Sequence, residues 1–223
     1  MNSSTHVGIR VGWWCGIIAM VMIVVGFFAI DKGGTTPADG PLDVLAREIT
    51  DQRGRIVVGN LLGMIGALAL VGFAAALRMR LTRHGQTGEM LGLIAYAFGV
   101  IMTVGALAHG SLQLAATTIS DPTILTEAIR AITIVEVQVS TLLGCAAIGL
   151  VATMSVASFL VGLLSRTMAW VGAILAVAAA AFIPTDHGAF GLALFLWLAV
   201  SCVLLLREKE PPETRERVAR GGV

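Results

Sequence analysis

The sequence has few charged residues, few prolines and few residues that ordinarily carry out chemistry. Asp, Glu, Lys and Arg make up 13% of the 223 residues, and there are six prolines and one tyrosine. Cys15, Cys145 and Cys202 form no CxxC or Cys/His spacing, which argues against a disulfide framework or a thiolate metal site and predicts packed thiols. A net charge of +1 with scattered basic residues argues against a nucleic-acid partner.

Apolar residues, in contrast, are abundant. They make up 57% of the chain, and the mean hydropathy is +0.88, which is typical of an integral membrane protein. Because about 20 apolar residues cross a hydrocarbon layer, the chain has room for several spans. The first apolar core, Val11 to Ile30, is longer than a signal-peptide core and predicts a retained anchor.

The long apolar windows predict an all-α, polytopic bundle of six transmembrane helices in a single domain, residues 1–206. The predicted spans are approximately 9–30, 56–77, 90–110, 136–163, 167–183 and 188–206. Residues 207–223 mix both charge signs after two prolines, so we expect a mobile tail.

The distribution of basic residues orients this bundle. One side of a six-span protein would carry ten of them: Arg10, Arg78, Arg80, Arg83, Arg166, Arg207, Lys209, Arg215, Arg217 and Arg220. The opposite side would carry five: Lys32, Arg47, Arg53, Arg55 and Arg130. Since cytoplasmic loops are enriched in Lys and Arg, the bias predicts that both termini are cytoplasmic.

Two segments have an internal order of their own. Asp39-Gly40-Pro41 can begin a short helix that runs to about Gln52, with Leu42, Leu45, Ala46 and Ile49 on one face, so we expect an amphipathic helix on the outer membrane surface. It could cover the mouth of the bundle or act as a lid. Asp121-Pro122 begins the fourth long helix, which could either continue unbroken to Leu163 or break near Arg130.

Small residues recur at four-residue spacing, which lets helices approach closely in lipid. Gly8, Gly12 and Gly16 form such a repeat in the first span. It predicts packing inside the bundle, with homodimerisation as the alternative.

The middle of every predicted span lacks ionisable residues, which argues against a charged path through the bilayer. Polar residues gather instead near the outer ends of several spans. The predicted ligand pocket consists of Asn60, His109, Gln113, Glu136, Ser140 and His187. Gly105, His109 and Gln113 share one helical face, and Thr133, Glu136 and Ser140 share another. Such a pocket suits a cationic or hydrogen-bonding group of an amphiphilic ligand.

A second hypothesis places zinc on His109, Glu136, Asp186 and His187, where it would assist hydrolysis of a lipid or another amphiphile at the outer interface. No HExxH or GxSxG motif accompanies these residues, and Asp186 is well placed to cap the last helix. We therefore predict no cofactor. A charged Glu136 would be costly inside the hydrocarbon core but not at the headgroup layer. Counting residues back from Leu163 places Glu136 at or above the headgroup layer.

Three segments resemble one known family: LRMRLTRHG after the second span, LLSRTMAWVGAILA between the fourth and fifth, and LFLWLAV in the last. Together with the order of spans over roughly residues 8–206, they resemble a family of uncharacterised six-helix bacterial integral membrane proteins of unknown function. The resemblance implies a bacterial inner-membrane location and supplies no catalytic residue. We expect a non-enzymatic binding, accessory or sensory protein whose partners are lipids and a second copy or another membrane subunit; a small-molecule transporter is the other alternative.

Overall fold

The computed structural model describes residues 3–31, 42–119, 121–182 and 188–207. They form α1 (Ser3–Asp31), α2 (Leu42–Asp51), α3 (Arg53–Leu81), the 3-10 turn η1 (Thr82–His84), α4 (Gly85–Thr118), α5 (Pro122–Val161), α6 (Arg166–Phe182) and α7 (Gly188–Arg207). No strand occurs within these ranges, which confirms the all-α prediction. Asp186, His187 and the tail from residue 208 lie outside the described residues.

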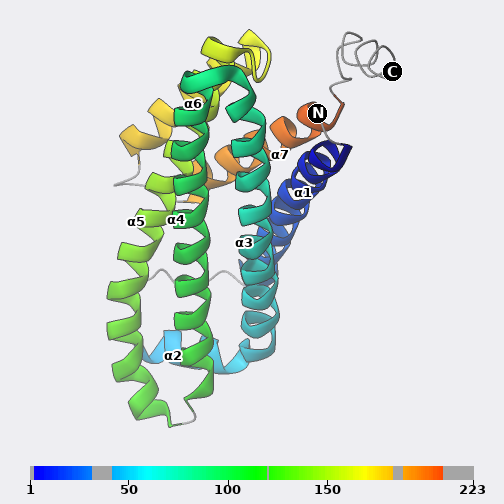
Figure 1. The fold of residues 1–223 in the computed structure, drawn as a ribbon. Helices are drawn as coiled ribbons and strands as arrows, with labels where there is room; N and C mark the ends of the chain where they lie inside the picture. The colour runs from blue at the N-terminus through cyan, green and yellow to red at the C-terminus, as the bar shows by residue number, and fades with distance from the viewer. Residues whose placement is uncertain (1–2, 32–41, 120, 183–187, 208–223) are drawn as a thin grey trace, which may run out of the picture.

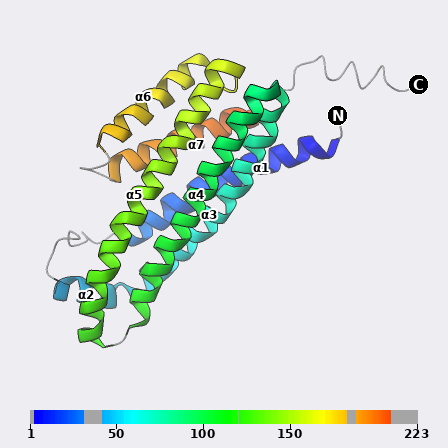
Figure 2. The same ribbon diagram turned by 60° about the vertical axis from the view of Figure 1, so that its left-hand side comes forward.

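The long helices run between two ends of the molecule. At one end, which we call the arginine end, lie η1, the α5–α6 connection, the start of α1 and the end of α7 (Figure 1). It carries Arg78, Arg80, Arg83, Arg166 and Arg207. At the other end, which we call the α2 end, lie the α4–α5 connection and α2, which runs across the direction of α3, α4 and α5. Figure 2 shows α1 crossing α3 obliquely.

Local signals set the helix boundaries. The N–H of Ile124 is 3.4 Å from Asp121 Oδ1, and Pro122 is the first helical residue, so α5 begins where the sequence predicts. Gly162 has φ of +71°, a conformation that favours glycine, and α5 ends just before it. Ser165 then caps α6, because its Oγ is 3.4 Å from the N–H of Met168.

α5 is continuous. Its 40 residues include position 130, where the sequence allowed a break, and correspond to about 60 Å at 1.5 Å per residue. This is about twice the thickness of a hydrocarbon core. α6 and α7, with 17 and 20 residues, are much shorter and pack against the half of α5 from Ala146 onward. The Trp197 indole joins them by donating a hydrogen bond to the Met168 carbonyl at 3.2 Å.

Glycines bring α1 against α3. A Cβ atom added at Gly26 would lie 2.6 Å from the Gly59 carbonyl oxygen, and one at Gly12 would lie 2.9 Å from the Gly72 carbonyl oxygen. A Cβ at Gly16 would meet Cys202 and Phe73 side chains. Gly12 and Gly16 therefore serve the predicted packing inside the bundle. The alternative, homodimerisation through the first helix, is not tested by these contacts.

The main apolar core joins α1, α3, α4, α5, α6 and α7. Trp13 and Phe73 are almost completely buried at its α1–α3 side, where their rings pack edge to face with centroids 5.8 Å apart. Cys202 is buried in this core and Cys15 half-buried, but Cys145 is exposed. The packed-thiol prediction is thus wrong for Cys145, which lies on the outward face of α5.

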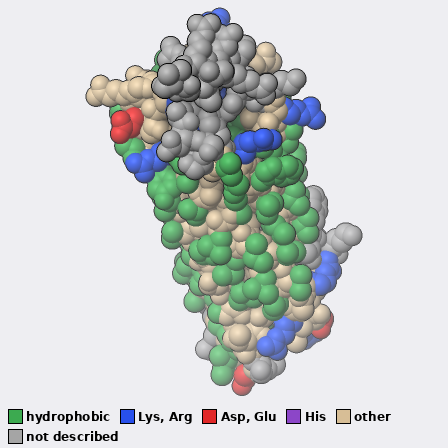
Figure 3. Space-filling model, turned by 45° about the vertical axis from the view of Figure 1, so that its right-hand side comes forward, with side chains coloured by type: hydrophobic (Ala, Val, Ile, Leu, Met, Phe, Trp, Pro, Cys, Tyr) green, Lys and Arg blue, Asp and Glu red, His purple; other side chains and the backbone are tan. Residues whose placement is uncertain are grey.

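The outer surface of the helices is apolar, the reverse of a water-soluble bundle. Exposed side chains follow one stripe on α1, formed by Val7, Val11, Trp14, Ile18, Val21 and Val25. Another follows α6, at Trp170, Ile174 and Val177. Figure 3 shows an apolar belt between charged ends. This surface suits lipid.

Three helical stretches of the described residues are long and apolar enough to cross a membrane: Val7–Gly26, Arg53–Thr118 and Ile134–Val161. The second stretch includes both α3 and α4, which lie side by side after the turn at η1 (Figures 1 and 2). Two shorter apolar helices follow, Arg166–Ala181 and Gly191–Arg207. The chain is therefore an all-helical protein with the apolar helices of a membrane protein.

The short helix predicted in the first loop is present as α2. Ile49 packs against a small second cluster, formed by Ala116, Leu125 and Ile129 with Ile119 and Ile132 around it. Val44 and Arg47 are exposed. α2 thus rests on the ends of α4 and α5, away from the main core.

Candidate functional site

Polar side chains from three helices meet in the half of the bundle nearer the α2 end. Asn60 of α3 donates a hydrogen bond from Nδ2 to Gln113 Oε1 of α4 at 2.8 Å. Gln113 Nε2 donates to Glu136 Oε1 of α5 at 2.5 Å and lies 3.2 Å from His109 Nε2. Glu136 Oε1 is also 3.5 Å from His109 Nε2. We call these four residues the outer polar cluster.

Helical spacing explains why these side chains meet. On α5 the core-facing positions follow Ile129, Ile132, Glu136, Leu143 and Ala146, so the carboxylate lies in the seam that faces α4. On α4, His109 and Gln113 are one turn apart on the face that contains the buried Gly105. Asn60 is buried on α3, with 4% of its surface exposed.

Small and flexible neighbours shape the space around the cluster. A Cβ at Gly110 would lie 2.9 Å from Met64 Cγ and 3.6 Å from Asn60 Oδ1, so α3 and α4 approach closely here. A Cβ at Gly105 would lie 3.0 Å from Leu143. The cluster therefore separates the main core from the smaller one beneath α2.

Two polar atoms of the cluster form no hydrogen bond with its other members. The side chains of His109 and Glu136 are 30% and 26% exposed. Only Oε1 of Glu136 takes part in the contacts above, so Oε2 has no partner among the described residues. His109 Nδ1 is buried without a hydrogen-bond partner in the described part of the chain. Of these two atoms, Glu136 Oε2 belongs to a partly exposed carboxylate that could interact with a further polar group.

The bonds within the cluster connect α3, α4 and α5. In membrane proteins such interhelical bonds contribute about 0.6 kcal/mol each on average, and about 1.7 kcal/mol at most. The cluster's own bonds are therefore a modest part of the fold's stability. A structural role alone needs no carboxylate, because an amide in place of Glu136 could accept the same bond from Gln113.

Two predicted pocket residues do not join these contacts. Ser140 is half-buried on the same helix as Glu136, and no hydrogen bond of its side chain is found among the described residues. His187 lies outside the described ranges, as does Asp186. The structure therefore brings three helices of the predicted layer into contact, through the side chains of Asn60, His109, Gln113 and Glu136.

Sequence reasoning missed one buried polar link. Thr103 of α4 lies closer to the arginine end, and its hydroxyl is 3.0 Å from the Ala67 carbonyl of α3 and 2.9 Å from the Gly99 carbonyl of its own helix. A threonine in an apolar run gives no charge signal. Its position six residues before His109, on the α3-facing side of the helix, is the only hint.

The zinc hypothesis needs more ligands than the described residues supply. Within the described ranges no three His, Cys, Asp or Glu side chains gather closely enough to hold a metal ion. His109 and Glu136 alone would give two ligands, whereas a catalytic zinc site ordinarily has three from the protein. The other two predicted ligands, Asp186 and His187, lie outside the described residues.

The chemistry available in the described part of the cluster is therefore hydrogen bonding and charge pairing. Glu136 offers a carboxylate oxygen, and His109 an imidazole that can gain a proton. Comparison of the chain with models of protein families, with curated proteins and with solved structures gives no match, so the assignment of function rests on the residues themselves.

Proposed function

We propose that the chain is a bacterial inner-membrane protein that crosses the bilayer six times, with both termini in the cytoplasm. Six apolar helices, α1 and α3 to α7, support six spans. The arginine end carries more arginines than the α2 end, where Arg47, Arg53 and Arg55 lie, and this excess supports the orientation. Exposed Trp14 and Trp170 follow Arg10 and Arg166 by one turn, as expected where a helix passes through the cytoplasmic headgroup layer.

Reporter fusions test this topology. Alkaline phosphatase fused after Arg83 or Arg217 is expected to be inactive, because both positions would lie in the cytoplasm. A fusion after Asp121, in the α4–α5 connection, is expected to be active and serves as the matched control. Activity after Arg83 or Arg217 would overturn the orientation.

In this orientation the outer polar cluster lies near the outer boundary of the hydrocarbon. At about 1.5 Å per residue, Asn60 is about 27 Å along α3 from Arg78. By the same rise, Glu136 is about 38 Å along α5 from Val161. Since the hydrocarbon core is about 30 Å thick, these distances, shortened by helix tilt, support a position at the outer headgroups.

The function that the cluster best supports is non-enzymatic binding of an amphiphile with a cationic head group, in an accessory or sensory protein. The observation that carries it is the unused Oε2 of Glu136, in a side chain that is 26% exposed. No Lys or Arg nitrogen among the described residues lies within 4 Å of this carboxylate. An ammonium group at the headgroup layer would supply the missing cation.

Native mass spectrometry in nanodiscs tests the binding. The probes are two phospholipids with the same acyl chains, one with a primary-amine head group and one with an anionic glycerol head group. We expect the wild-type protein to retain the amine lipid preferentially. Glu136→Gln keeps the shape of the side chain but removes its charge, and should reduce this retention about tenfold, which corresponds to about 1.4 kcal/mol.

The matched control is Glu89→Gln, the same substitution at an exposed glutamate near the arginine end. It should leave the preference unchanged. Equal retention of the two lipids by the wild-type protein, or equal retention of the amine lipid by both glutamine variants, would contradict the proposed site.

A further inference from the structure

The single tyrosine of the chain contacts an arginine near the arginine end of the bundle. The Cζ atom of Arg78 on α3 lies over the ring of Tyr96 on α4, 5.7 Å from the ring centroid. This distance is within the range of a cation–π contact, about 6 Å. Arg78 is exposed and Tyr96 is half-buried, so the contact lies on the outer surface, where α3 and α4 meet.

A glycine makes room for this contact. A Cβ atom added at Gly92 of α4 would lie 3.3 Å from Cα and 3.4 Å from Cγ of Arg78. Gly92 and Tyr96 are one turn apart on the same face of α4. The stem of Arg78 therefore lies against Gly92, and its guanidinium reaches the ring one turn along the helix.

Both polar groups of this contact are hydrogen-bond donors without an acceptor among the described residues. The Arg78 guanidinium carries five N–H donors, and its contact with the ring is the one polar or aromatic interaction found for it there. The Tyr96 hydroxyl forms no hydrogen bond in the same part of the chain. Glu89 shares this face of α4, but no ion pair joins it to Arg78. A negatively charged acceptor would therefore satisfy both groups.

The apolar surface of α3 supports a position for Arg78 at the level of the lipid phosphates. The segment from Asn60 to Arg78 is about 27 Å long, close to the thickness of a hydrocarbon core, about 30 Å. Leu61, Ile65 and Leu68 are exposed along it, as expected for side chains that face acyl chains. Arg78 ends this apolar segment at the boundary where phospholipids carry their phosphates. The argument holds for either orientation of the chain in the membrane.

We propose that Arg78 and Tyr96 bind the phosphate group of a phospholipid. The planar guanidinium donates two parallel hydrogen bonds to two phosphate oxygens, and the Tyr96 hydroxyl donates one more. Every phospholipid carries this phosphate, so the site accepts amine and glycerol head groups alike. It lies at the opposite end of the bundle from the outer polar cluster, and it does not rest on the function proposed for that cluster.

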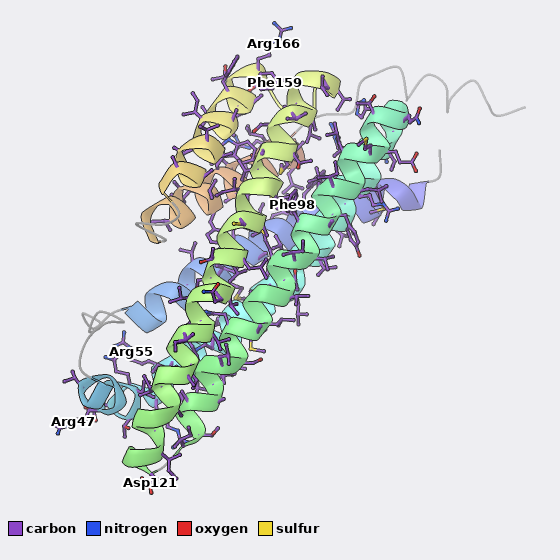
Figure 4. The ribbon with its side chains drawn as sticks, turned by 90° about the vertical axis from the view of Figure 1, so that its left-hand side faces the viewer. Arg47, Arg55, Phe98, Asp121, Phe159 and Arg166 are labelled. Carbon is purple, nitrogen blue, oxygen red and sulfur yellow. The ribbon has the colours of Figure 1, made fainter. Side chains whose placement is uncertain are left out.

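Solid-state fluorine NMR of protein labelled with 3-fluorotyrosine tests the site, because the chain has a single tyrosine. In phospholipid bilayers we expect dipolar coupling to lipid phosphorus to attenuate the fluorine signal, and Arg78→Gln to abolish the attenuation. Arg166→Gln is the matched control, since Arg166 points away from the helices at the same end (Figure 4), and it should change nothing. In bilayers of a neutral glycolipid, inorganic phosphate should not restore the attenuation; full restoration would show a site for free phosphate instead.

Native mass spectrometry separates this site from the outer polar cluster. Arg78→Gln should reduce retention of the amine and the glycerol phospholipid alike, by about tenfold relative to a neutral glycolipid with the same acyl chains. Tyr96→Phe keeps the ring but removes the hydroxyl, and should reduce both by about threefold. Glu136→Gln should affect the amine lipid alone. Unchanged phospholipid retention in Arg78→Gln, or a wild-type fluorine signal without attenuation, would refute the phosphate site and leave the amine preference to be decided separately.

Discussion

The variant Gly16→Ala is expected to be less stable than the wild-type protein by about 1–3 kcal/mol, the usual cost of overpacking. The added methyl would lie 2.6 Å from Cys202 Sγ and 2.8 Å from Phe73 Cδ2. At such distances the Cys202 and Phe73 side chains, or the helices that carry them, must shift. The free energy of unfolding in mixed micelles, followed by tryptophan fluorescence, measures the loss.

Gly63→Ala is the matched control, because a Cβ at that position of α3 meets no atom within 4 Å. Alanine favours a helix interior over glycine by about 1 kcal/mol, so this variant should be unchanged or somewhat more stable. The same substitution is thus expected to lower the stability of the protein at Gly16 and to preserve or raise it at Gly63. If both variants gained stability, the close α1–α3–α7 contact would be wrong.

The variant Phe73→Ala should lose about 2–4 kcal/mol, the largest effect that we expect from a single residue. Phe73 has no exposed surface, and its ring packs on Trp13 with an interplanar angle of 62°. In water, such a substitution costs about 3–5 kcal/mol; in lipid the transfer contribution is smaller, because the unfolded reference state is also apolar, but the lost contacts and the cavity remain.

Phe159→Ala provides the comparison. Phe159 also makes an edge-to-face contact, with Trp170 at 5.1 Å, but it is 41% exposed on the apolar surface, near the arginine end that Figure 4 marks with Arg166. Lipid can fill the space that its ring leaves, so only the aromatic contact is lost, about 0.5–1.5 kcal/mol. Equal losses in the two variants would show that Phe73 is not in a closed core.

Helix existence and helix starts could be predicted from the sequence because both depend on local chemistry. Long apolar windows correspond to α1 and α3 to α7, and Asp121-Pro122 begins α5 as expected. Continuity through position 130 was left open because an unbroken helix is about twice as long as a hydrocarbon core, although arginine is a good helix former and gives no local break signal. Figure 4 shows the result, with α5 running from Asp121 at the α2 end toward Phe159.

The candidate site was predictable as a layer but not as a set of contacts. Helical spacing placed His109 with Gln113 on one face and put Glu136 on a face of α5, but it could not tell which helices are neighbours. Neighbours depend on close backbone approaches, such as that of α3 and α4 at Gly110. The central position of Gln113, which contacts three side chains from three helices, emerges only from that packing.

The polar layer between the two apolar clusters affects how cooperatively the protein unfolds. Ala116, Leu125 and Ile129 form a buried cluster separate from the main core, and Ile49 is the described side chain of α2 that packs against it. Opening this small cluster would break few apolar contacts, whereas α6 and α7 protect the other half of α5. Among the described residues we therefore expect two cooperative units of unequal stability, the weaker of which lies at the α2 end beside the outer polar cluster.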